Sequence, residues 1–115
     1  MLPKINRLKA ISDFKTVLGK GKILENRFIK TKFVKNGKNF SRFGFIVSTK
    51  FYKKASKRNL VKRRLRAAVI FFSKKIKPGY DIVIWPREAV KENENYIVIK
   101  DSLRELLIKN GILSV

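Results

Sequence analysis

Apolar and polar positions alternate along the chain with periods that predict most of its secondary structure. Near the N-terminus, Phe14 and Leu18 keep helical spacing behind Ser12, which suits an N-cap, while Gly19 and Gly21 suit a helix end. This pattern predicts a short first helix.

Two segments, residues 27–34 and 42–49, alternate with the period of two that a strand requires. Asn36-Gly37 lies between them and is a turn signal, so we expect the two to pair as antiparallel strands. A third run, from Asp81 to Trp85, predicts a short buried strand that Pro86 ends.

The longest helical pattern covers residues 53–72, with Ser56 or a neighbour as its cap, and it is amphipathic. On one arc lie Val61, Leu65, Ala68, Val69 and Phe72, and on the opposite arc lie Arg58, Asn59, Lys62, Arg63 and Arg66. A final helix from about Asn95 to Lys109 is favoured over a strand at 97–99, because helical spacing continues up to an Asn110-Gly111 stop.

Length and composition predict one small domain spanning residues 1–115, and the helices and strands predicted above make its class α+β. The 115 residues are 44% hydrophobic, which is enough for one core and hardly for two. The N-terminus lacks a signal-peptide pattern, and no apolar run approaches the roughly 18 residues of a membrane span, so neither secretion nor a membrane-spanning segment is expected. The absence of cysteine excludes disulfides and thiolate zinc sites and fits a cytoplasmic location.

The formal net charge of +21 indicates a polyanionic partner, most simply nucleic acid, with an anionic membrane surface as the weaker option. Six cations fall within the ten residues KRNLVKRRLR, from Lys57 to Arg66, and no acidic residue stands among them. Because the first turn of a helix already carries partial positive charge, Lys57 and Arg58 are expected to need a negative ligand there. We interpret that ligand as a phosphate backbone.

No catalytic constellation is visible in the sequence. The chain has no histidine and only eight carboxylates, so an autonomous nuclease would lack obvious acid, base or metal-binding groups. Asp101 and Glu105 lie one helical turn apart, but Arg104 and Lys109 nearby favour a surface ion-pair network over a metal pair. The residues therefore predict a binding protein.

The order of several motifs resembles the bacterial ribonuclease P protein component. A strand ending in VSTK, a basic connection YKKAS and the helix opening RNLVKRRLR carry the resemblance, and NRLKAISDF, PGYDIVIWPR and NYIVIKDSLRELL extend it over nearly the whole chain. The family signature of the helix is matched by Arg58, Asn59, Lys62, Arg63 and Arg66. Leu60 stands where arginine is usual, so either that contact is lost or Arg64 partly replaces it.

This resemblance implies a subunit of the ribonucleoprotein that removes the 5′ leader from precursor tRNA, with one protein per catalytic RNA. The RNA would perform the chemistry with magnesium ions that it mainly binds itself, and the protein would supply no catalytic residue. It also implies a mostly antiparallel sheet of about four strands packed with three helices, with a left-handed βαβ crossover. The helix signature would face the catalytic RNA. Lys50, Lys53 and Lys54 precede this helix, and their charges would guide the RNA strand toward the N-terminal end of the helix.

The resemblance further implies a cleft for the single-stranded leader between the first helix and the sheet. Phe14 matches an aromatic position of that cleft, while Leu18 and Thr31 stand at two other positions that are aromatic in relatives. Phe33 lies two residues beyond Thr31, on the same strand face, and is the candidate substitute ring. For both phenylalanines, core packing and base stacking are about equally favoured, whereas Trp85 is expected in the core.

Two other functions remain open. A basic ribosomal or rRNA-binding protein of architectural role would share the size and charge, although the short, apolar ends of this chain differ from the extended basic tails of such proteins. A DNA-binding module would need base-reading polar residues along the exposed helix face, which after Asn59 offers chiefly cations.

Overall fold

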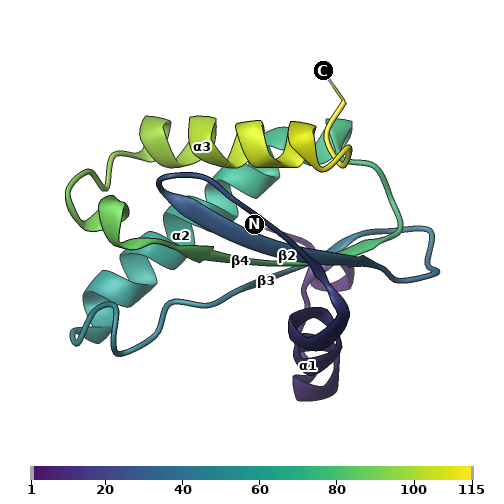
Figure 1. Ribbon diagram of the computed structural model, residues 1–115, viewed down its shortest axis with the longest axis horizontal. Coiled ribbons are helices and arrows are strands. Elements are labelled where there is room, and N and C mark those ends of the chain that lie inside the picture. Colours follow the sequence, from purple (N-terminus) through teal and green to yellow (C-terminus); the bar gives the residue numbers. More distant parts are fainter. Residues whose placement is uncertain (1, 115) are drawn as a thin grey trace.

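The computed structural model describes residues 2–114 and has the predicted α+β architecture (Figure 1). In chain order the regular elements are α1 (Ile11–Lys20), β1 (Lys22–Glu25), β2 (Ile29–Lys35), β3 (Arg42–Phe45), α2 (Ala55–Phe72), β4 (Tyr80–Pro86) and α3 (Tyr96–Lys109). Short 3-10 turns occupy Lys4–Asn6, Ser73–Lys75 and Glu88–Lys91. The predicted class, three helices on one four-stranded sheet, is confirmed.

The strands lie in the order β1-β2-β4-β3, with antiparallel β1–β2 and β2–β4 pairs and a parallel β3–β4 pair. The predicted direct pairing of segments 27–34 and 42–49 is therefore wrong, because β4 lies between them. Ile82, Val83 and Ile84 of β4 are fully buried, and a strand that is apolar on both faces is favoured in the centre of a sheet. The β3–α2–β4 connection is a βαβ crossover, whose hand stays a prediction of the resemblance.

Two layers cover the sheet from opposite sides: α2 and α3 pack on one face, and α1 lies against the other (Figure 1). The predicted apolar arc of α2 is confirmed, since the buried residues of this helix are Val61, Leu65, Ala68, Val69 and Phe72. They join buried side chains of α3, such as Leu103 and Leu107, in the larger core. A smaller cluster beneath α1 is built around Val17 and Val83.

Helix boundaries differ from the prediction at the N-terminal ends. α1 begins after Ala10, and Ser12 lies inside it, where its carbonyl accepts a hydrogen bond from Thr16. The helix runs through Gly19 to Lys20, and β1 follows at once as a strand that the pattern did not predict. α2 begins after Lys54 with Ser56 in its first turn and no side-chain cap.

The C-terminal helix agrees closely with the prediction. The side chain of Asn95 accepts a hydrogen bond from the Ile97 N–H at 2.8 Å and so caps the helix. Gly111 follows the helix with a φ of +74°, a conformation that favours glycine. Within the described residues, no helix combines the length and the apolar character that crossing a bilayer would require.

Candidate nucleic-acid interface

The outer face of α2 carries an open depression of about 490 Å³ lined by Ser56, Asn59, Lys62, Arg63 and Arg66. We call the last four residues the cationic ridge. Asn59 and Arg63 are exposed, whereas Lys62 and Arg66 are half-buried. Among the described residues, none of the three ridge cations forms an ion pair with a carboxylate. The ridge therefore keeps its positive charge for an external anion.

The flank of α2 next to Glu94 is neutralised from within. Lys57 Nζ lies 2.9 Å from a Glu94 carboxylate oxygen, the Tyr52 hydroxyl donates to the same carboxylate, and Arg64 donates to the Glu94 carbonyl. No acidic residue stands within the basic run, but Lys57 has an acidic partner from outside it. Because Arg64 is held on this flank, its geometry argues against its replacing an arginine at Leu60.

The contacts around Glu94 shift the pKa values of two groups, the Tyr52 phenol and the Glu94 carboxyl. Burial, and then the hydrogen bond to Glu94, raise the pKa of the Tyr52 phenol. The hydrogen bonds from Tyr52 and Lys57 lower the pKa of the Glu94 carboxyl below its ordinary value. Glu94 therefore stays ionised and holds the 88–95 connection against the start of α2.

Arg58 is also used internally. Its Nη1 donates to the carbonyls of Tyr52 and Lys53, at 2.8 Å each, and so ties the preceding loop to α2. The expectation that Lys57 and Arg58 require an external anion at the helix start is therefore corrected, since Glu94 and two backbone carbonyls already contact them. The three lysines of the loop, at positions 50, 53 and 54, are exposed.

A second cavity, of about 370 Å³, opens between the N-terminal segment, α1, β3 and α2. We call it the cleft, and its lining is Leu2, Arg7, Leu8, Lys9, Phe14, Phe43, Gly44, Phe45, Lys62 and Arg66. Lys62 and Arg66 line both this cleft and the ridge depression, and the Arg66 guanidinium lies 5.8 Å from the centroid of the Phe45 ring. The cleft and the ridge are therefore one continuous cationic surface.

Gly44 decides where the Phe14 ring lies. A Cβ at position 44 would fall 2.5 Å from Phe14 Cζ and 2.6 Å from Cε1, so only glycine lets the ring lie against β3. The ring is half-buried and lines the cleft, a position between the core-packing and stacking alternatives. Arg7 and Lys9, which also line the cleft, were missed, although both stand in the NRLKAISDF segment.

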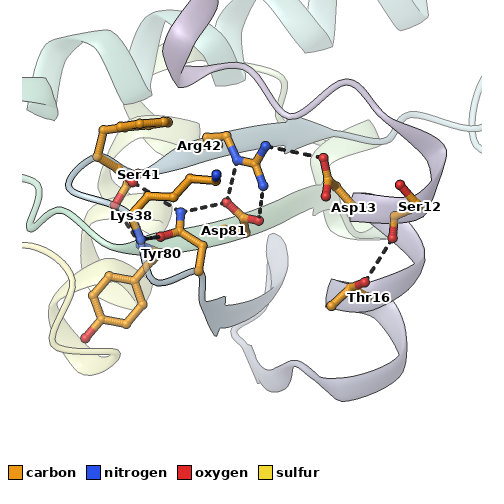
Figure 2. Close-up of polar contacts among 10 residues, drawn as sticks. Ser12, Asp13, Thr16, Lys38, Ser41, Arg42, Tyr80 and Asp81 are labelled. Carbon is orange, nitrogen blue, oxygen red and sulfur yellow. Dashed lines mark hydrogen bonds and ion pairs between the residues drawn. The ribbon is translucent and has the colours of Figure 1, made fainter.

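A partly buried ion-pair network joins α1 to β3 (Figure 2). Arg42 donates to both carboxylate oxygens of Asp81, at 2.9 and 2.6 Å, and reaches Asp13 of α1 at 3.3 Å. Asn36 donates to Asp81 at 2.9 Å. The hydrogen bond to Asp81 is the main cause that raises the pKa of Arg42. Because Asp13 precedes Phe14, this network sets the register of the ring against Gly44.

Thr31 and Phe33 do not line the cleft, and their assignment to it is wrong. Thr31 is fully buried, and its hydroxyl donates to the Leu24 carbonyl. Phe33 packs against the core under α2 and α3, with its ring 6.2 Å from that of Tyr80. Strand residues alternate between faces, so the residues of β2 that face α1 are the even-numbered ones.

The even-numbered lysines of β2 occupy the sheet face next to α1. Lys32 Nζ donates to the Leu18 carbonyl at 2.6 Å near the end of α1, and Lys30 Nζ lies 5.4 Å from the centroid of the Trp85 ring. Leu18 and Trp85 are both half-buried and pack against the small cluster beneath α1. The prediction that Trp85 belongs to the core is met in part: the half-buried ring packs against this cluster, and its remaining surface forms part of the face next to α1, beside Lys30.

The described residues contain no group of three or more His, Cys, Asp or Glu side chains that could hold a metal ion. The predicted ion pairing on α3 is present for Glu105, which lies 3.2 Å from Lys109 Nζ.

Comparisons with known proteins place this surface in context. A family model described as "Ribonuclease P" matches residues 2–110. The "Ribonuclease P protein component" of Caldanaerobacter subterraneus subsp. tengcongensis is 35% identical over 112 residues, which cover 97% of this chain and 95% of the relative. Among solved structures, the ribonuclease P protein of Thermotoga maritima has a TM-score of 0.81 at 35% identity and covers 88% of this chain and 94% of its own. That of Staphylococcus aureus has a TM-score of 0.85 at 26% identity and covers 95% and 98%.

Proposed function

The chain belongs to the ribonuclease P protein family and is similar throughout to protein components of this tRNA-processing ribonucleoprotein, and from that premise we propose how its surface works. We propose that the cationic ridge grips the catalytic RNA and that the cleft takes the single-stranded 5′ leader of precursor tRNA. The observation that carries the proposal is that Lys62 and Arg66 line both cavities.

The chemistry of the surface suits these two ligands. Unpaired lysine and arginine side chains on the ridge bind phosphates without reading sequence, as a large folded RNA requires. The cleft combines cations with the half-buried Phe14 ring, and aromatic faces stack bases of any identity. Leaders vary in sequence, so a binding site built from phosphate contacts and stacking fits them.

Hydrolysis would be performed by the RNA and by magnesium ions bound mainly to it, with one protein molecule per RNA in the cytoplasm. The protein's own residues would hold the leader and the RNA in a fixed relation, because Lys62 and Arg66 line both the cleft and the ridge depression. Positioning of this kind lowers the barrier by replacing a loose encounter with a fixed geometry. We assign no proton transfer to the protein.

The test is reconstitution of the full-length protein with bacterial ribonuclease P RNA and precursor tRNA at low magnesium concentration. We expect the wild-type protein to stimulate leader removal and the Lys62→Gln/Arg66→Gln variant to lose most of that stimulation. The salt dependence of binding should weaken as well, by about 1.4 to 1.8 in the slope of log K against log salt concentration for two lost phosphate contacts.

Lys109→Gln is the matched control, because it also removes a lysine charge from a helix but lies outside the ridge and the cleft, paired with Glu105. It should leave stimulation and the salt slope close to wild type. A protein that stimulates nothing in this assay yet co-sediments with ribosomal particles would instead be an architectural rRNA-binding protein.

A further inference from the structure

A third cavity lies on the side of the sheet opposite α1, where the end of α2 meets α3 and the C-terminal segment. Its volume is about 600 Å³. We call it the α2–α3 groove, and its charged lining residues are Lys74, Lys75, Lys100, Arg104 and Asp101. No residue of this groove lines the ridge or the cleft.

The groove is walled by backbone that is held in place. The tail runs beside the turn after α2, with the Lys77 N–H donating to the Ile112 carbonyl at 2.7 Å and the Ser114 N–H donating to the Lys75 carbonyl at 3.1 Å. Leu113, another lining residue, is buried beneath them. The shape of the groove is thus fixed before any ligand arrives.

Charge in the groove is left without internal partners. Four cations face one carboxylate there, and none of the four forms an ion pair among the described residues. Four unpaired cations gathered around one hollow that holds a single carboxylate favour an anionic ligand.

Phe71 adds an aromatic face to this charge. It is 65% exposed, so most of its ring surface is not used to fill the core. Lys100 Nζ lies 4.5 Å from the centroid of the Phe71 ring and 5.9 Å from that of Tyr96. An exposed cation–π contact is weaker than a charge-assisted hydrogen bond to phosphate, so a phosphate would draw Lys100 from the ring and leave the ring free for a base.

We propose that the α2–α3 groove is a second binding site for unpaired RNA, in which Phe71 stacks a base and Lys74, Lys75, Lys100 and Arg104 contact the flanking phosphates. A site that joins one exposed ring to several cations matches single-stranded nucleic acid better than duplex, because bases within a duplex have no free face. Phe71 follows Arg63 of the ridge by eight residues, about 12 Å along the helix, so one RNA molecule can occupy both surfaces.

The experiment uses the full-length protein and a fluorescein-labelled 10-nucleotide oligouridine, with two readouts. Anisotropy of the label reports all binding. Fluorescence of Trp85, the only tryptophan, reports binding at the sheet face next to α1, on the far side of the molecule from the groove. We expect a stoichiometry of two, with only one of the two events changing Trp85 fluorescence.

Phe71→Ala combined with Lys100→Met should weaken the Trp85-silent event by about tenfold or more while leaving the Trp85 signal unchanged. Lys109→Met is the matched control on α3 and should alter neither event. Phe71 is exposed, so the variant should keep the wild-type thermal transition. Phe71→Leu, which keeps apolar area but removes the ring face, should lose binding as Phe71→Ala does.

A stoichiometry of one, or a Trp85-silent event that the groove variants do not weaken, would overturn the proposal. So would an acidic peptide that occupies the groove more tightly than the oligonucleotide. Failure of this proposal can be told apart from failure of the proposed function. The ridge and cleft are tested by leader removal with the Lys62→Gln/Arg66→Gln variant, whereas the groove is tested by oligonucleotide binding with the Phe71 and Lys100 variants.

Discussion

Substituting Gly44 by alanine tests the role of the cleft with a single methyl group. The added Cβ would lie 2.5 Å from Phe14 Cζ, whereas carbon atoms in contact prefer about 3.5 to 4.0 Å, so the ring must retreat by about 1 Å. Gly44 does not have a positive φ, so the substitution introduces no backbone strain. The perturbation is therefore confined to the position of the ring and its neighbours.

The cost in stability should be small because the ring can swing toward the cleft. Overpacking a core costs about 1 to 3 kcal/mol, and we expect the lower end, which lowers the melting temperature by about 4 °C. The effect on binding should be larger. A base stacked on an aromatic ring contributes about 1 to 3 kcal/mol, so the displaced ring should weaken binding of precursor tRNA to the reconstituted holoenzyme by about fivefold or more.

The assay compares Kd values for precursor and mature tRNA, since only the precursor carries a leader. Gly44→Ala and Phe14→Ala should each weaken precursor binding and leave mature binding unchanged. In the Phe14→Ala background, Gly44→Ala should have almost no further effect, because the ring it displaces is gone. Equal losses for the two tRNAs, or additive effects of the two substitutions, would refute the reasoning.

Two other contacts give sharp expectations. Arg63→Ala should weaken binding of the catalytic RNA with almost no change in melting temperature, whereas Arg58→Ala should cost about 1 to 2 kcal/mol of stability, because Arg58 holds two backbone carbonyls; comparable melting temperatures for both variants would contradict this assignment. For Glu94, whose pKa is lowered in the folded state, the stabilising contribution is complete above its ordinary pKa of 4.5 and is lost as the pH falls through its folded value. Glu94→Gln should therefore have a lower free energy of unfolding than wild type in chemical denaturation at pH 7, and the difference between the two proteins should shrink as the pH falls below 4.5. A difference that stays constant over this range would show that the carboxylate charge contributes nothing.

Much of the fold follows from local pattern. The buried arc of α2, the extent of α3 and its Asn95 cap could be predicted because helical spacing and capping chemistry are properties of neighbouring residues. The position of β4 between β2 and β3 could not be predicted in this way, because strand order depends on which apolar runs bury both faces.

The same distinction between local pattern and tertiary structure applies to the candidate site. The sequence by itself determined that one helix presents a dense cationic arc, since charge and periodicity are both local. Only the tertiary structure decided which of these cations are free. Glu94 comes from the segment before α3 and holds Lys57 and Arg64, whereas Lys62, Arg63 and Arg66 meet no such carboxylate within residues 2–114.

The cleft depended on tertiary structure more strongly still. The alternation in β2 showed that Thr31 and Phe33 share a face, but the sequence of β2 does not indicate which face of the strand α1 packs against. That choice is made where Asp13 meets Arg42 and Phe14 meets Gly44, contacts between residues about 30 positions apart in the chain that exist only once α1 has docked on β3.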